Sequence, residues 1–252
     1  MRKHKFFAAL CLLMAFCTQW SCTEDYEYTK NEPKWMGESL YATLKGDKRF
    51  TIYLQMLQRM DSAYVAVLDK TGSRTLFVPD DDAFKAFFQS NPYGYNSVAD
   101  MPTSLISEFL KYYTLENAYV TTMLGYSENY TPGDCLRRYT TFNNTDTIPY
   151  VDNFPDNPQF AKFRGKKMYL SSPGNWTLTN FTQLYFSAKA FTADDFNKLY
   201  PNRTWNNGDV YIFDAKIVDK DIISKNGYIH VVDKVVLPPK NMYEHLRDNE
   251  DI

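Results

Sequence analysis

The chain has 252 residues, of which 44% are hydrophobic and 23% are charged, and its formal net charge at pH 7 is −2. This apolar content is ample for a buried core, and the length suits one domain with elaborations. The mild acidic excess and the lack of a basic cluster argue against nucleic-acid binding.

The N-terminus has the pattern of an export signal. Arg2, Lys3 and Lys5 provide a basic start, and an almost unbroken apolar run follows at Phe6–Phe16. This run is too short to cross a bilayer as a helix, but it suits the core of a signal peptide. A buried N-terminal helix is the alternative. No later apolar stretch approaches membrane-spanning length.

The segment after this run resembles the lipobox of bacterial lipoproteins. It reads Gln19-Trp20-Ser21-Cys22, with a small residue before the cysteine, although Trp20 and Gln19 depart from the strict pattern. The resemblance implies that the Cys22 thiol takes a diacylglycerol and that cleavage before it frees an N-terminus for a further acyl chain. Several acyl chains hold a protein firmly at a membrane. We therefore expect lipidation at Cys22.

The remaining cysteines do not predict a disulfide scaffold. Cys11 and Cys17 would leave with the leader, which leaves Cys135 single once Cys22 is lipidated. A scaffold held by disulfides is therefore not expected, although the protein would be exported. A bridge between Cys22 and Cys135 is the alternative.

The residues after Cys22 are acidic and polar as far as Pro33. This acidic start resembles the signal that sends some lipoproteins to the outer face of the outer membrane. A solvated tether is the alternative, since every lipoprotein needs one. We expect an outer-membrane protein that faces the cell exterior.

The first half of the body is predicted to be mainly helical. Ser39–Met60 has an apolar stripe at helical spacing, and Asp47 is a plausible cap for its second half. Arg74–Val78 reads as a short strand. Asp80–Asp82 then suit the first turn of a helix, because acidic residues there complement the helix dipole. Ser104–Thr114 repeats the helical pattern.

The region Leu124–Gly208 is rich in Asn, Asp, Thr, Pro and aromatic residues, and we interpret it as an enlarged loop insertion. Within it, Lys167–Ser171 is a predicted strand. Thr192–Leu199 is a predicted short helix, in which Thr192 and Asp195 match a capping pair.

Two predicted strands close the body. Tyr211–Val218 alternates apolar and polar side chains, as a strand with one buried face does. Tyr228–Leu237 is a nearly continuous apolar run, which indicates burial on both faces. Asn226-Gly227 between them is a strong turn signal.

Two segments resemble the fasciclin domain. Thr75–Phe84 (TLFVPDDDAF) matches the first signature block of that family, and Asn226–Pro239 (NGYIHVVDKVVLPP) matches its closing block. The resemblance covers roughly Glu38–Pro239 and implies an α+β fold, a β-sandwich or wedge flanked by several α-helices. Such domains are typically extracellular and often adhesive. Tyr113 stands where the family usually has a histidine linked to packing and partner adhesion, so a histidine-dependent contact does not carry over.

The predicted organisation has four parts. The C-terminal residues 241–247 echo residues 39–45, and because fasciclin domains often occur in tandem, a second copy could begin there. A chance amphipathic tail is the alternative. The parts are a signal peptide at 1–21, a lipidated tether at 22–37, a fasciclin-like domain at 38–239, and a linker or the start of a second repeat at 240–252.

No catalytic, metal-binding or cofactor-binding motif is evident. The chain lacks a Gly-rich phosphate loop, a nucleophile elbow and a paired-His zinc helix. His230 is expected to be a core or edge histidine, and Asp80–Asp82 are better explained as a helix cap than as an acid–base or metal cluster. Cys135 has no histidine nearby in the sequence and is not expected to be a nucleophile. We expect a non-enzyme without cofactor or metal.

Two functions remain open. The first is a cell-surface module for adhesion or protein–protein interaction, whose partner is an outer-membrane or matrix protein contacted through the insertion. The second is an accessory glycan- or nutrient-binding subunit of a TonB-dependent importer. Sugars stack on exposed aromatic rings, although such rings more often pack inside the protein. The candidate ligand-contact aromatics are Trp176, Trp205, Tyr150 and Tyr169.

Overall fold

The computed structural model of the chain describes residues 37–70, 72–143, 145–148, 158, 168–171, 176–240 and 245–246. For 145–148 and 168–171 it describes the backbone alone. The described residues fall in one compact unit, Gly37–Ile252. The predicted signal peptide, Cys22 and nearly all of the tether lie outside them, as does most of the predicted second repeat.

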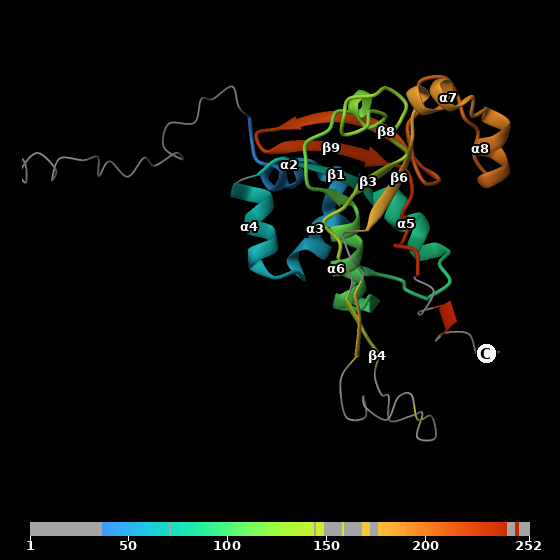
Figure 1. Cartoon of the computed structure of the whole chain (residues 1–252). Coiled ribbons are helices and arrows are strands. Elements are labelled where there is room, and N and C mark those ends of the chain that lie inside the picture. Colours follow the sequence, from blue (N-terminus) through green and yellow to red (C-terminus); the bar gives the residue numbers. More distant parts are fainter. Residues whose placement is uncertain are drawn as a thin grey trace, which may run out of the picture. The chain divides into compact units, whose positions relative to one another are not determined.

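Seven α-helices occur in the described part of the chain. Figure 1 shows that the first five lie on one side of the central strands, whereas the last two form a separate pair. Short 3-10 turns lie at Lys48–Phe50 (η3), Val98–Asp100 (η4) and Thr121–Met123 (η5). The α-helices are α2 (Leu40–Gly46), α3 (Thr51–Gln58), α4 (Ser62–Lys70), α5 (Asp81–Gln89), α6 (Thr103–Tyr112), α7 (Gln183–Lys189) and α8 (Ala193–Leu199).

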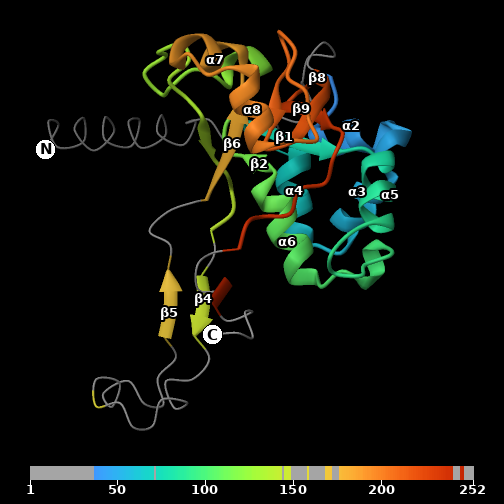
Figure 2. The ribbon, with the colours of Figure 1, turned by 90° about the vertical axis from the view of Figure 1, so that its right-hand side faces the viewer.

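Seven strands form one mixed sheet. A separate two-stranded ribbon, β4 (Thr145–Ile148) with β5 (Met168–Ser171), extends from the insertion (Figure 2). In spatial order the sheet strands are β2 (Thr114–Leu115), β1 (Arg74–Pro79), β9 (Gly227–Val232), β8 (Ala215–Ser224), β7 (Tyr211–Ile212), β6 (Thr177–Phe181) and β3 (Arg137–Tyr139).

The two motif blocks lie side by side at the centre of this sheet. β1 and β9 pair in parallel, from Arg74 opposite Gly227 to Pro79 opposite Val232. The strands are buried over almost their whole length. This agrees with the apolar run of the closing block, because a parallel strand is covered on both faces.

The sheet curls until its two edge strands meet at one point. Leu115 of β2 forms an isolated bridge with Thr140, the residue after β3. The Thr141 N–H donates to the Thr114 carbonyl at 2.8 Å. Beyond this contact β2 and β3 are not paired.

Two hydrophobic clusters fill the body. The main cluster joins α2–α6 to β1, β2 and β9, and Phe50, Phe77 and Phe109 are fully buried in it. A smaller aromatic cluster lies under α7 and α8. Its buried members are Phe181, Phe186, Phe196, Trp205 and Tyr211.

The single helix predicted over Ser39–Met60 is wrong. α2 ends at Gly46, and Asp47 has an extended backbone with φ −107° and ψ 118°. The Asp47 carboxylate accepts the Arg49 N–H at 2.9 Å, so Asp47 does cap the next turn. The helix breaks because this side chain competes for an N–H that a continuous helix would use.

The single strand predicted over Tyr211–Val218 is also wrong. β7 and β8 are separated by a turn at Phe213 and Asp214, where Phe213 has φ 52°. The Phe213 ring stacks on that of Tyr112 with centroids 6.2 Å apart. This long-range packing stabilises a turn that the alternation of side chains does not reveal.

The strand predicted over Tyr228–Leu237 ends earlier, at Val232. The Asp233 carboxylate accepts two N–H groups of the Arg203 guanidinium, at 2.8 and 3.0 Å. It also accepts the Lys216 N–H at 2.8 Å. The Asp233 N–H still donates to the Lys216 carbonyl at 3.0 Å, but the Lys216 N–H bonds to the Asp233 side chain in place of a main-chain carbonyl, so the regular pairing with β8 ends here.

The other main predictions are confirmed. The fold is α+β, with a sheet flanked by helices. The Asp80 carboxylate caps α5 by accepting the Ala83 N–H at 2.8 Å. Thr192 and Asp195 form a reciprocal capping box at α8. The predicted strand Lys167–Ser171 matches β5 within one residue.

Substitution of Gly227 should destabilise the whole domain. Gly227 has φ +152°, and a Cβ there would lie 1.9 Å from the Arg74 carbonyl oxygen of β1. Because that neighbour is backbone, Gly227→Ala is expected to lower the free energy of unfolding by about 3 kcal/mol. Urea denaturation measures this difference. The matched control is Gly46→Ala, since nothing lies within 4 Å of a Cβ there. Equal stability of the two variants would contradict the close approach.

Candidate functional site

A hollow of about 360 Å³ lies where five distant segments meet, after α5, on α6, after β3, before β6 and after β9. Rings and prolines dominate its lining, and we call it the aromatic groove. Its defining residues are Tyr93, Tyr95, Phe142, Trp176, Pro238 and Pro239.

Asn91 organises the tyrosine side of the aromatic groove. Its Oδ1 accepts the N–H groups of Tyr93 and Tyr95, both at 3.1 Å. Its Nδ2 donates to the carbonyls of Phe87 and Tyr95, at 3.1 and 2.7 Å. The two tyrosine rings stack with centroids 5.7 Å apart, and Tyr93 is 46% exposed. One ring face is therefore available at the surface and is held by a rigid turn.

Trp176 also lines the aromatic groove. The main-chain N–H of Trp176 donates to the Phe142 carbonyl, and the main-chain carbonyl of Trp176 accepts the Thr140 N–H, both at 2.8 Å. The ring packs against Phe142 at 5.4 Å and against Tyr112 at 6.4 Å, yet it is only partly buried. Among the four predicted ligand-contact aromatics, Trp176 is the one that the structure places in a hollow.

Of the other three predicted aromatics, the structure describes the side chain of Trp205 alone. Trp205 is 7% exposed, and its ring stacks on Phe186 with centroids 3.8 Å apart. Its position in the smaller cluster makes it a packing residue, because its ring faces are covered. Tyr150 lies outside the described residues. Tyr169 lies in β5, where only the backbone is described.

Sequence reasoning missed Tyr93 and Tyr95. The segment Asn91-Pro92-Tyr93-Gly94-Tyr95 directly follows a predicted helix. It combines turn-forming residues with two aromatic rings, and turn chemistry of this kind often displays side chains at a surface. That combination was the available signal.

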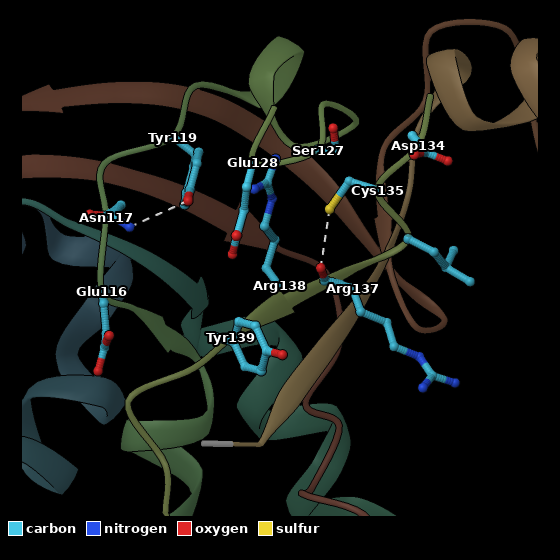
Figure 3. Close-up of a pocket in the computed structure, with 11 residues that line it drawn as sticks. Glu116, Asn117, Tyr119, Ser127, Glu128, Asp134, Cys135, Arg137, Arg138 and Tyr139 are labelled. Atoms are coloured by element: carbon cyan, nitrogen blue, oxygen red, sulfur yellow. Dashed lines mark hydrogen bonds between the residues drawn. The ribbon is translucent and has the colours of Figure 1, made fainter. Parts of the chain in front are cut away.

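A second, larger hollow of about 490 Å³ lies where β2 and β3 diverge (Figure 3). We call it the β2–β3 cleft. Nothing in the sequence pattern predicted it, because it arises from the curl of the sheet. Its two walls are Glu116, Asn117 and Tyr119 after β2, and Arg137, Arg138 and Tyr139 of β3.

Cys135 at the end of this cleft is not an activated thiol. It is a free cysteine, 7% exposed, and its Sγ–H donates to the Arg137 carbonyl at 3.1 Å. Burial raises the pKa of the thiol, so the neutral form dominates at pH 7. A bridge to Cys22 stays untested, because Cys22 lies outside the described residues.

His230 and the acidic run Asp80–Asp82 serve the fold. His230 is fully buried; its Nδ1 accepts the Asp221 N–H at 3.0 Å, and its Nε2 bonds to the Tyr119 carbonyl at 2.9 Å. Asp81 accepts the Ile52 N–H at 2.8 Å, which ties α3 to α5. In the described part of the chain, no three His, Cys, Asp or Glu side chains are grouped to hold a metal ion.

Tyr113 is a packing residue. It is fully buried, and its hydroxyl accepts the Val236 N–H at 3.1 Å. Burial raises its pKa well above the usual value, so the hydroxyl stays neutral. The side chain holds the segment after β9 against α6 and offers no surface contact.

The fasciclin domain model matches residues 48–162 and 169–238, more than half of the chain. The chain belongs to the fasciclin family. Among solved structures it is similar to a FAS1 domain pair from the insect cell adhesion molecule Fasciclin I, with 10% sequence identity and a TM-score of 0.37. The match covers 78% of this chain and 48% of that one, so this chain spans about half the length of the pair. No curated protein matches the sequence significantly.

Fasciclin domains occur in adhesion and protein-interaction proteins and are generally non-catalytic. Several hollows open on the described part of this fasciclin chain, among them the aromatic groove and the β2–β3 cleft. None of its described helices is long and apolar enough to cross a bilayer.

The buried His230 should make stability depend on pH. Burial holds its pKa below the ordinary value of 6.5. As the pH falls below 6.5, His230 becomes protonated in the unfolded chain but stays neutral in the folded protein. The free energy of unfolding should therefore decrease. Denaturant titrations between about pH 7.5 and 5.5 measure this slope.

His230→Gln is the control for this effect, because glutamine does not titrate. Its slope over the same pH range should be shallower than that of the natural protein. Identical slopes for the two proteins would show that His230 is not the group responsible.

Proposed function

We propose that this fasciclin domain is a lipid-anchored, cell-surface binding module of a bacterium, used in adhesion or protein–protein interaction. The aromatic groove carries this proposal. It presents an exposed, rigidly held tyrosine face together with Trp176 on a surface that five separate segments build. Tyr and Trp are enriched at the points that dominate protein–protein binding energy.

The aromatic groove fits a protein segment with apolar side chains. Pro238 and Pro239 contribute apolar surface without N–H donors, while Glu108 and Lys240 add charged side chains to the lining. Preformed apolar pockets with few polar groups bind by burying the ligand's surface. A partner's aromatic or aliphatic side chain would lie between Tyr93 and Trp176.

The proposed anchor at Cys22 would leave room for such contacts. About fifteen residues separate Cys22 from the first described residue, Gly37, and an extended segment of that length reaches about 50 Å. The domain would then stand clear of the membrane surface and could meet either a neighbouring membrane protein or a partner outside the cell.

A second candidate is the accessory glycan- or nutrient-binding subunit of a TonB-dependent importer. The partly exposed rings of Tyr93 and Trp176 favour it, because sugar faces stack on aromatic rings. The two candidates differ in the partner that the aromatic groove would hold, which the second experiment below separates.

The anchor is tested by Cys22→Ala. We expect this variant to lose metabolic labelling with palmitate and to leave the outer-membrane fraction, because no thiol remains for acylation. Mass spectrometry of the natural protein should show an acylated N-terminal cysteine. Cys135→Ala is the control and should keep both the label and the location. An unprocessed, unmodified natural N-terminus would contradict the anchor.

The aromatic groove is tested by Tyr93→Ala. Loss of this contact ring should weaken binding of the partner about tenfold. The partner is first isolated by cross-linking in outer membranes and then purified for the affinity measurement. Tyr130→Ala is the matched control, because Tyr130 is 72% exposed and does not line the aromatic groove. A transporter as partner, or a glycan bound with the same dependence on Tyr93, would favour the importer role. An unchanged affinity of the Tyr93→Ala variant for the partner would contradict the proposal.

A further inference from the structure

β3 has one open edge. The Asn180 N–H donates to the Leu136 carbonyl and the Thr140 N–H to the Trp176 carbonyl, both at 2.8 Å, so the even-numbered residues bond toward β6. In an antiparallel pair, the intervening residues direct their main-chain groups the other way. The N–H groups of Arg137 and Tyr139 therefore face the β2–β3 cleft.

The opposite wall of the β2–β3 cleft does not meet this edge. After Leu115 the chain forms hydrogen bonds with β1. Thr75 Oγ1 donates to the Asn117 carbonyl at 2.7 Å and accepts the Tyr119 N–H at 2.8 Å. β2 and β3 diverge as a result, and the cleft of about 490 Å³ opens between them (Figure 3). The long axis of the β2–β3 cleft runs along the open edge of β3.

A buried cation lines this cleft. Arg138 is 6% exposed, and its guanidinium lies 4.4 Å from the centre of the Tyr119 ring. Nη2 donates to the carbonyls of Met123, at 2.8 Å, and Tyr126. Nε has no hydrogen-bond partner. Buried charges in proteins are normally paired with an opposite charge. A negatively charged group of a ligand could therefore provide the ion pair that the Arg138 guanidinium lacks.

The carboxylates near the cleft do not neutralise Arg138. Asp134 pairs with Lys189 at 2.6 Å. Glu128 lines the cleft but forms no ion pair with Arg138 within 4 Å, and no other described carboxylate does. Arg137 adds a second, exposed guanidinium on the same strand. Because successive strand residues point to opposite faces, Arg138 is the cation on the buried face of β3.

We propose that the β2–β3 cleft binds an extended segment of a partner protein that carries an Asp or Glu opposite Arg138. The segment adds as a strand to β3 and exchanges main-chain hydrogen bonds with Arg137 and Tyr139. In an antiparallel addition, the residue opposite Arg138 belongs to a non-hydrogen-bonded pair, in which the side chains approach most closely. The burial pattern of β3 is exposed, buried, exposed, so this carboxylate points inward to the guanidinium. This site is separate from the aromatic groove and does not depend on what that groove binds.

The experiment uses the full mature protein and a library of random seven-residue peptides displayed on phage. We expect selected peptides to share an acidic residue at one central position, flanked by residues that favour strands. Replacing that residue by Gln or Asn in a synthetic peptide should weaken binding about tenfold in fluorescence polarisation. No selected binder, or binders without an acidic position, would overturn the proposal.

Variants of β3 test the two kinds of contact separately. Tyr139→Pro removes the N–H that faces the cleft and should weaken peptide binding about fivefold, whereas Tyr139→Ala keeps this N–H and is its matched control. Glu128→Gln removes a negative charge that would repel an acidic peptide and should strengthen binding. Equal binding by the Pro and Ala variants would overturn strand addition.

Arg138→Gln should bind the acidic and the amide peptide equally, because the proposed ion pair is gone. Circular dichroism checks that this variant folds. If it does not fold, the peptide substitution on the natural protein still decides the charge contact. Retained discrimination between the two peptides by a folded Arg138→Gln protein would overturn the role of Arg138.

Discussion

The parallel pairing of β1 with β9 is the interaction on which the rest of the fold depends. It joins segments about 150 residues apart in sequence and requires a glycine where Gly227 approaches the Arg74 backbone. The preceding Asn226 extends this order to the helices. Its Oδ1 accepts the Leu40 N–H at 2.8 Å, and its Nδ2 donates to the Leu68 carbonyl at 3.0 Å. One turn thus positions the central strands together with the start of α2 and the end of α4.

Both hollows arise from the other end of the same sheet. Thr140 bridges Leu115 and bonds to the Trp176 backbone, so the short strand β3 lies between the aromatic groove and the β2–β3 cleft. A rigid sheet carries both binding surfaces, while loops supply most of their side chains. This division agrees with the general location of recognition on loops held by a scaffold.

Local features were predictable from the sequence because their causes lie within a few residues. The caps at Asp80 and Thr192 each satisfy N–H groups three residues away, and the Asn226-Gly227 turn lies between two apolar runs. The errors have the opposite origin. The break after Ile212 depends on Phe213 packing against Tyr112, and the end of β9 depends on Arg203 binding Asp233. These partners are far apart in sequence, so a periodicity argument cannot include them.

The sequence by itself determined the family, the α+β class and the order of the main elements, since motif blocks and apolar periodicity record which residues must be buried. It also selected Trp176 as a candidate contact residue. Only the tertiary structure decided that Trp205 is a packing ring, that Tyr93 and Tyr95 line the same groove as Trp176, and that Arg138 is a buried cation without a carboxylate partner. The physical reason is that burial and charge pairing depend on which distant segments come into contact. In this protein the curl of the sheet decides those contacts.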